Sequence, residues 1–255
     1  MKRLSVLLYG ILAYEFAMAN LLYAIGFVGN IVVPKSIDVG HAAGWRQALP
    51  VDLALLALFA LQHSGMARQG FKRWITQHVP QPLERSTYVA FASVTLTLLF
   101  WQWRAMPETV WTVANPAARQ ALYVLFWVGW VLVPFSTFLI NHFELFGLQQ
   151  VINATRGRDS REPDFKTPGL YKIVRHPIYL GFIVAVWAAP DMTLGHLVFA
   201  LAISGYILIG IALEERDLVH RFGERYLQYR REVRMIVPWP RRSEAAVELA
   251  DEQLR

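Results

Sequence analysis

Residues 167–181 read TPGLYKIVRHPIYLG, and residues 214–240 read EERDLVHRFGERYLQYRREVRMIVPWP. These charged sequences lie at the two ends of the apolar segment 178–213, in which Asp191 is the only formal charge. Asp191 follows Pro190 in a turn-like sequence, so the apolar segment is expected to fold back on itself rather than continue as one helix. The sequence therefore predicts a helical hairpin whose charged ends lie on the same side of a membrane.

The two arms of this hairpin differ in length. The first arm, residues 178–189, has twelve residues and spans roughly 18 Å, which is short for a hydrocarbon core of roughly 30 Å. The second arm, residues 193–213, is long enough to cross. Arg175-His176-Pro177 lies at the entrance of the hairpin and Glu214-Glu215 at its exit. We therefore expect these charged groups to meet at one membrane face.

The composition places the whole chain among membrane proteins. It has 255 residues, 55% of them hydrophobic, and a mean hydropathy of +0.32, which is too apolar for an ordinary soluble domain. Cysteine is absent, which excludes disulfides, thiolate nucleophiles and Cys-ligated metal sites. The net charge of +6 comes from Lys and Arg in short loops beside apolar runs. This pattern predicts membrane topology and no nucleic-acid partner.

Further transmembrane helices are expected before the hairpin, the first from the N-terminus and the others at about residues 50–66, 86–103 and 118–140. With the hairpin, this gives an all-α polytopic membrane protein with about five to six transmembrane helices. A cleaved signal peptide is the alternative for the first segment, because Ala17-Met18-Ala19 has small residues at cleavage-site spacing. The apolar pattern continues to Pro34, which favours a helix that stays in the membrane.

The number of Lys and Arg residues alternates between the loops. Loops 29–49 and 104–119 have two each, whereas loop 67–85 has four and loop 141–175 has six. Because basic residues favour cytoplasmic loops, this predicts a multi-pass protein of the bacterial inner membrane with both termini in the cytoplasm.

The positions of several polar and aromatic side chains in the apolar segments can also be predicted. Glu15 and Asn20 are costly in lipid and are expected to face other helices or a cavity. No HxxxH or HExxH spacing occurs, so no metal is predicted, and His63 and His196 are expected to form interhelical hydrogen bonds. Trp101, Trp103 and Trp111 are expected to anchor the outer interface of the membrane.

The order of motifs in the C-terminal part resembles one superfamily of membrane enzymes. Arg175-His176-Pro177-x-Tyr179-x-Gly181 is followed by the hairpin, by Glu214-Glu215 and by Phe222-Gly223-x-x-Tyr226-x-x-Tyr229. This order is similar to the C-terminal core of the isoprenylcysteine carboxyl methyltransferase and phospholipid methyltransferase superfamily. These integral-membrane enzymes use S-adenosylmethionine. The resemblance implies three parts: N-terminal transmembrane helices in residues 1–140, a methyltransferase core in 141–240 with a cytosolic-face cofactor pocket, and a polar tail in 241–255.

Two further segments resemble one branch of this superfamily. They are residues 141–151, NHFELFGLQQV, and residues 188–196, AAPDMTLGH. The branch is the bacterial methanethiol S-methyltransferases, which make dimethyl sulfide, with denitrification-associated relatives next to them. The resemblance implies methyl transfer to a small thiol. A lipid-like or prenylcysteine acceptor, and a non-enzymatic membrane protein, are the alternatives.

The resemblance also implies a set of cofactor contacts. S-adenosylmethionine carries its own reactive methyl group, and the protein positions it. Its methionine carboxylate needs a cation, and its ribose hydroxyls need a carboxylate or an amide. Only one of two adjacent glutamates need point into the pocket, because neighbours on a helix are about 100° apart. The implied contacts are Gln149, Gln150, Arg175, His176, Tyr179, Gly181, Glu214 and Glu215.

The acceptor needs a different group. A thiol attacks as its thiolate, so a base or a cationic anchor is expected near the methyl group. The candidates for this catalytic role are His142, Glu144, His176 and Tyr229, with Arg230 behind them. For His142 and Glu144, a helix-capping or loop-bracing role is the alternative.

Overall fold

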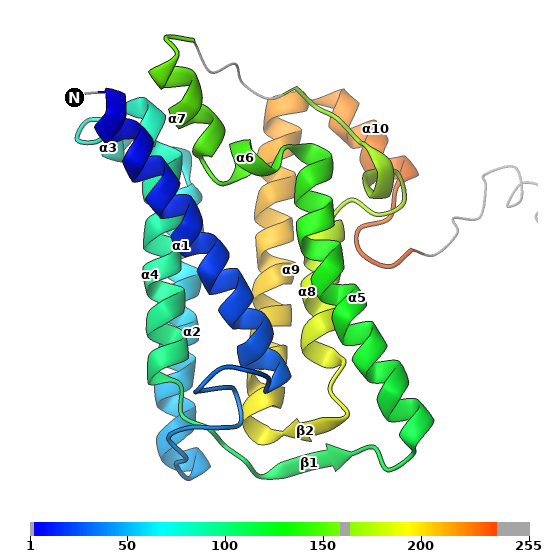
Figure 1. Ribbon diagram of the computed structural model, residues 1–255. Coiled ribbons are helices and arrows are strands. Elements are labelled where there is room, and N and C mark those ends of the chain that lie inside the picture. Colours follow the sequence, from blue (N-terminus) through cyan, green and yellow to red (C-terminus); the bar gives the residue numbers. More distant parts are fainter. Residues whose placement is uncertain (1–2, 159–163, 239–255) are drawn as a thin grey trace, which may run out of the picture.

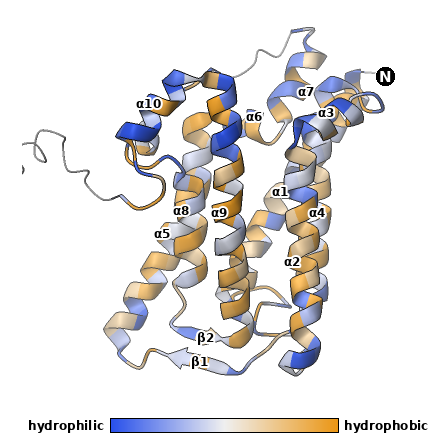
Figure 2. Ribbon diagram, turned by 180° about the vertical axis from the view of Figure 1, so that it is seen from behind, coloured by the Kyte–Doolittle hydropathy of each residue, from blue (hydrophilic) through white to orange (hydrophobic). Residues whose placement is uncertain are grey.

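The computed structural model describes residues 3–158 and 164–238. In these residues the chain forms a bundle of long helices with a short pair of strands at one end (Figure 1). The N-terminus and the last helix lie at the opposite end, where hydrophilic residues gather (Figure 2). We call these the sheet end and the basic end. The predicted polar tail, residues 241–255, lies outside the described residues.

The described residues include four helices that are long and apolar enough to cross a membrane. A further helix, α4 (Glu84–Gln102), has 19 residues and packs against two of them, α1 and α2. This architecture confirms the predicted all-α polytopic fold. The four helices are α1 (Arg3–Gly29), α2 (Trp45–Ala67), α5 (Pro116–Ile140) and α9 (Leu194–Phe222).

The predicted hairpin is present as α8 (Pro177–Trp187) followed by α9. Thr193 caps the start of α9, because its Oγ1 accepts a hydrogen bond from the His196 backbone N–H at 3.1 Å. The helix continues beyond the apolar arm, which ends at Leu213, to Phe222. Glu214 and Glu215 therefore lie at adjacent positions of one helix, as expected.

A small sheet joins the hairpin turn to the loop between α4 and α5. Strand β1 (Thr109–Thr112) pairs with β2 (Asp191–Thr193) in an antiparallel ladder. Arg119 of α5 also contacts the turn through an ion pair with Asp191 at 2.6 Å, and this hydrogen-bonded pair holds the pKa of Asp191 below its ordinary value. The sequence did not predict this pairing, since its strands are distant along the chain.

The bundle has two groups of helices. Helix α4 packs against α1 and α2, and α8 packs against α5 and α9, while α2 touches α9. The largest buried cluster lies toward the sheet end and includes Phe27, Leu99, Trp103 and Phe199. Trp103 is fully buried and donates its indole N–H to the Ile37 carbonyl at 3.0 Å. Its predicted place at the membrane interface was therefore wrong.

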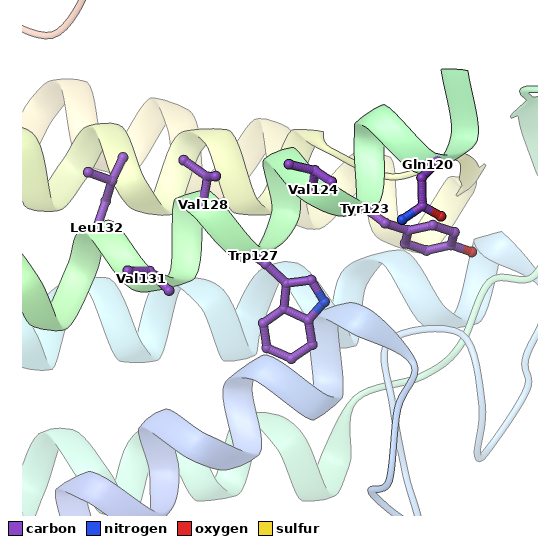
Figure 3. A pocket seen from close by; sticks show the side chains of 7 residues that line it. All are labelled: Gln120, Tyr123, Val124, Trp127, Val128, Val131 and Leu132. Carbon is purple, nitrogen blue, oxygen red and sulfur yellow. The ribbon is translucent and has the colours of Figure 1, made fainter. Parts of the chain in front are cut away.

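Glycines set the closest helix contact, between α5 and α8. A Cβ on Gly129 would lie 2.7 Å from the Gly181 carbonyl oxygen, and a Cβ on Gly181 would lie 2.8 Å from the Gly129 carbonyl oxygen. Small residues at such a crossing let two backbones approach closely. The opposite face of α5 is apolar and exposed, with Trp127 and Val131 along an open groove of about 530 Å³ (Figure 3). This face suits contact with lipid.

Short helices cover the basic end: α3 (Gln69–Ile75), α6 (His142–Leu145), α7 (Leu148–Thr155) and α10 (Glu224–Glu232), with single 3₁₀ turns at Gln81–Leu83 and Gly169–Lys172. Helix α7 packs against α1, whereas α10 packs against α9. Figure 1 places α7 and α10 on different sides of the bundle. The residues of the predicted methyltransferase core, 141–240, are thus divided between the α1 side and the α9 side of the bundle.

The polar residues of the long helices mostly satisfy the packing predictions. Asn20 is buried and accepts a hydrogen bond from Thr97 at 2.9 Å. His63 bonds to Tyr88 at 2.8 Å, and His196 bonds to the carbonyl of residue 186 at 2.9 Å, so the predicted interhelical hydrogen bonds are confirmed. Glu15 is exposed on the outer side of α1. The prediction that it faces other helices was wrong, because its helical position points it away from the bundle.

Candidate functional site

The backbone before α8 is held by the chain that follows α10. The N–H of Arg175 donates to the Arg234 carbonyl at 2.8 Å, and the N–H of His176 donates to the Met235 carbonyl at 3.1 Å. Pro177 occupies the first turn of α8, where its missing N–H costs nothing. These contacts fix the Arg175 and His176 side chains against α9.

Glu215 is the centre of the site. Its Oε1 accepts from Arg175 Nε at 2.7 Å and lies 3.1 Å from His176 Nε2, while its Oε2 lies 3.1 Å from Arg230 Nε. The side chains of Glu215 and Arg175 are only 8% and 9% exposed. Arg175 also donates to the carbonyls of Arg230 and Val233. Both oxygens of Glu215 are therefore engaged in holding α8, α9 and α10 together.

Glu214 has a different environment from its neighbour. Its side chain is 45% exposed. Tyr179 donates its hydroxyl to Glu214 Oε2 at 3.0 Å, and His176 Nδ1 lies 3.8 Å from the same oxygen. Glu214 is therefore the carboxylate of the pair that a ligand can reach.

A cavity of about 390 Å³ adjoins Glu215. This volume lies within the range of about 300–1,000 Å³ that small-molecule sites occupy. The lining combines apolar and charged side chains, so the cavity suits a ligand with an apolar part and a charged part. Its lining residues are Leu208, Ile211, Ala212, Glu215, Arg216, Val219, Arg230 and Met235.

Tyrosines of α10 close the site from the basic end. Tyr226 is buried, and its hydroxyl has no hydrogen-bond partner among residues 3–158 and 164–238. Tyr229 donates its hydroxyl to the Tyr171 carbonyl at 2.5 Å, and burial raises the pKa of Tyr229 to about 12. Tyr229 therefore remains protonated at neutral pH and serves as a donor.

His142 and Glu144 lie elsewhere, on α6. Both ring nitrogens of His142 have partners, with Nδ1 2.8 Å from Thr137 Oγ1 and Nε2 2.8 Å from Tyr14 Oη. Burial lowers the pKa of His142, so its ring is held in the neutral form. Glu144 accepts from the Asn141 side-chain amide at 2.7 Å. Both residues brace the turn between α5 and α7, which is the role we gave as the alternative.

Gln149 and Gln150 lie on α7, beside this turn. Gln149 donates to Asn153 at 2.9 Å within the helix, and Gln150 donates to the Glu144 carbonyl at 3.1 Å. The Gln150 side-chain oxygen is buried without a partner in the described part of the chain. The structure thus groups Arg175, His176, Tyr179 and both glutamates, and keeps the α6–α7 residues together in a second place.

A third polar group was given no functional role by the sequence. It consists of Phe59, His63, Tyr88 and Tyr206, which we call the inner aromatic cluster. The His63 ring stacks on Phe59 at 5.3 Å and lies 5.1 Å from the Tyr88 ring. In the sequence, the inner aromatic cluster is visible only as polar aromatic residues near the basic ends of several apolar segments.

The residues fit S-adenosylmethionine in their chemistry. Glu214, which lies outside the cavity lining, offers an accessible carboxylate for ribose hydroxyls, and Arg230 offers a cation within the lining. The charged and apolar residues of the lining match a molecule with a zwitterionic end and an aromatic end.

Comparisons with known proteins show the family of the chain. The family described as NnrU protein matches residues 53–238. A methanethiol S-methyltransferase of Mycobacterium tuberculosis is 56% identical over 95% of this chain and 99% of its own length. Methanethiol S-methyltransferase 1 of Bradyrhizobium diazoefficiens is 58% identical over 92% of this chain and 82% of its own length. Nurim of Rattus norvegicus is 33% identical over 73% of this chain and 77% of its own length.

No solved structure matches the chain. The matched residues 53–238 contain the whole hairpin and both glutamates at its exit. The resemblance expected from the sequence is confirmed by these relatives. The chain therefore belongs to the NnrU protein family, in the group of membrane methyltransferases that the methanethiol S-methyltransferases represent.

Proposed function

We propose that this chain transfers a methyl group from S-adenosylmethionine to methanethiol and so forms dimethyl sulfide. The observation that carries the proposal is the convergence of Arg175, His176, Tyr179, Glu214 and Glu215 in one hydrogen-bonded site. The names of relatives that are 56% and 58% identical support methanethiol as the acceptor. The four spanning helices support a location in the membrane.

The cofactor supplies a methyl group on a positively charged sulfur, and the chain positions and desolvates the reactants. Glu214 binds the ribose hydroxyls, and Arg230 offers a cation to the carboxylate of the donor. Arg175 holds Glu215 in place, and Glu215 in turn holds Arg230 at the cavity. Gly181 supports the site through its close contact with α5.

A small apolar acceptor suits a site between membrane helices. Methanethiol partitions into lipid and can enter the site laterally from the bilayer, so no soluble substrate domain is needed. A neutral thiol must lose its proton before it attacks. His176 is already engaged with Glu215, and Tyr229 with a backbone carbonyl, so neither is free to accept this proton.

The test is headspace gas chromatography on detergent-purified protein supplied with methanethiol and S-adenosylmethionine, beside calorimetric titration of the cofactor. Dimethyl sulfide from the intact chain, dependent on the cofactor, is the expected result. Cofactor binding without dimethyl sulfide would overturn the small-thiol acceptor and direct attention to lipid-like acceptors. Absence of cofactor binding by folded protein would overturn the proposal as a whole.

A further inference from the structure

An open space lies beside Gly210 on α9. A Cβ added to Gly210 would meet no atom within 4 Å, although the residue is partly buried. Tyr206 and Glu214 lie four residues before and after it, so all three share one face of the helix, a turn apart. The space therefore lies between the Tyr206 side chain and the carboxylate that a ligand can reach.

Contacts on either side of Gly210 turn this face toward α2. The Tyr206 hydroxyl lies 3.1 Å from Ser64 Oγ, and Asp217 forms an ion pair with Arg68 at 3.1 Å. Both partners belong to the basic end of α2. Gly210 lies between these contacts along α9, so the open space lies in the region where the two groups of helices meet.

Tyr206, which precedes Gly210 by one turn of α9, belongs to the inner aromatic cluster. The rings of His63 and Tyr206 lie 6.4 Å apart, and His63 Nε2 lies 2.8 Å from the Tyr88 hydroxyl. His63 Nδ1 is buried and has no hydrogen-bond partner within residues 3–158 and 164–238. A buried polar atom without a partner is costly and calls for an explanation such as a ligand.

We infer that the methyl acceptor, a small neutral thiol, binds beside Gly210 between Tyr206 and Glu214, and that His63 Nδ1 accepts its proton. The inference rests on the proposed function. The Nδ1 atom can accept when Nε2 carries the ring proton and donates it to the Tyr88 oxygen.

Two bonds break and two bonds form in this step. The thiol S–H bond breaks, and the proton moves to His63 Nδ1. The sulfur electron pair of the acceptor forms a bond to the donated methyl carbon. The old bond from that carbon to the donor sulfur breaks, and its electron pair stays on the donor sulfur. His63 then returns the proton to water.

The first test fills the space. Gly210→Leu should lower kcat/KM for methanethiol by about tenfold or more, because the leucine side chain occupies the acceptor's place. The affinity for S-adenosylmethionine, measured by calorimetry, should stay within about twofold of the intact chain. Gly205→Leu is the matched control, since Gly205 is exposed on the same helix and its Cβ would also meet no atom within 4 Å.

The outcomes separate the two proposals. Equal kcat/KM in Gly210→Leu and Gly205→Leu would overturn the acceptor site while leaving the proposed function intact. No turnover by the intact chain would instead overturn the proposed function itself. A weakened cofactor affinity in Gly210→Leu alone would assign the space to the donor and overturn the acceptor site.

The second test removes the proton acceptor. His63→Gln keeps a side chain that can bond to Tyr88 but cannot take up a proton, so kcat should fall by about a hundredfold. The affinity for S-adenosylmethionine should not change. A kcat equal to that of the intact chain would overturn the role of His63, and a parallel loss of cofactor affinity would show that the residue is only structural.

Discussion

Glu214 and Glu215 are neighbours in the sequence, yet they have different tasks at the scale of single residues. Glu215 has both oxygens engaged by Arg175, His176 and Arg230, and it is almost completely buried. Glu214 shares one oxygen with Tyr179 and remains accessible. One carboxylate therefore holds the site together, and the other is available to the cofactor.

This difference predicts opposite results for two substitutions. Glu215→Ala leaves the Arg175 guanidinium buried without its carboxylate, which should destabilise the protein by about 3–5 kcal/mol. Glu214→Gln keeps an acceptor for Tyr179 and should leave stability unchanged, but it removes the charge that binds ribose hydroxyls. Its affinity for S-adenosylmethionine should fall by about tenfold or more.

Thermal unfolding in detergent and calorimetric titration distinguish the two variants. Arg216→Ala is a suitable control, because Arg216 lines the same cavity and lies beside the pair on the helix, so its loss should leave stability near that of the intact chain. Normal cofactor affinity in Glu214→Gln, or normal stability in Glu215→Ala, would contradict the assignment at that position.

At the scale of elements, the crossing of α5 and α8 depends on two glycines. A Cβ on Gly129 would lie 2.6 Å from the Ala185 backbone nitrogen and 2.7 Å from the Gly181 carbonyl. Gly129→Ala should therefore force the helices apart and destabilise the protein by about 1–3 kcal/mol. The shift of α8 should also weaken cofactor binding, since Arg175 and His176 precede this helix directly.

The control for this prediction is Gly205→Ala. Gly205 is exposed on α9 with open space around its Cβ, so alanine should stabilise the helix by up to about 1 kcal/mol. Unfolding midpoints measured in the same detergent give the comparison. If Gly129→Ala unfolds at the same temperature as Gly205→Ala, the glycine contact does not set the helix packing.

At the scale of the whole molecule, the basic end carries both the site and the termini of the described chain. The distribution of Lys and Arg predicts that this end faces the cytoplasm. A green fluorescent protein fused to the C-terminus should therefore fluoresce, and an alkaline phosphatase fused there should be inactive. A fusion within loop 104–119 should show the reverse pattern. Active phosphatase at the C-terminus would invert the assigned orientation.

The sequence predicted the features that depend on neighbouring residues. The hairpin, its short first arm and the charged ends follow from apolar length and from a turn at Pro190. Glu15 and Trp103 were placed wrongly, because the side of a helix that meets the bundle depends on contacts with distant segments. The clamp of residues 234 and 235 on Arg175 and His176 was missed for the same reason.

The site was predicted as a motif rather than as a geometry. Spacing brought Arg175 and Glu215 together correctly, because both flank one hairpin. It could not separate them from His142 and Gln149, which lie within the predicted core, 141–240, but pack toward α1. The inner aromatic cluster has no local sequence motif, because its contacts join residues that are far apart in the sequence.

The bonds from Arg175 to the Arg230 and Val233 carbonyls have a consequence for biosynthesis. The ribosome makes these carbonyl groups more than fifty residues after Arg175. The hairpin therefore enters the bilayer while its arginine still lacks these partners, and the site closes only when the last part of the chain emerges. A protein cut short before residue 230 would insert its helices in the usual order and yet remain inert, so translation to the end acts as the final step of maturation.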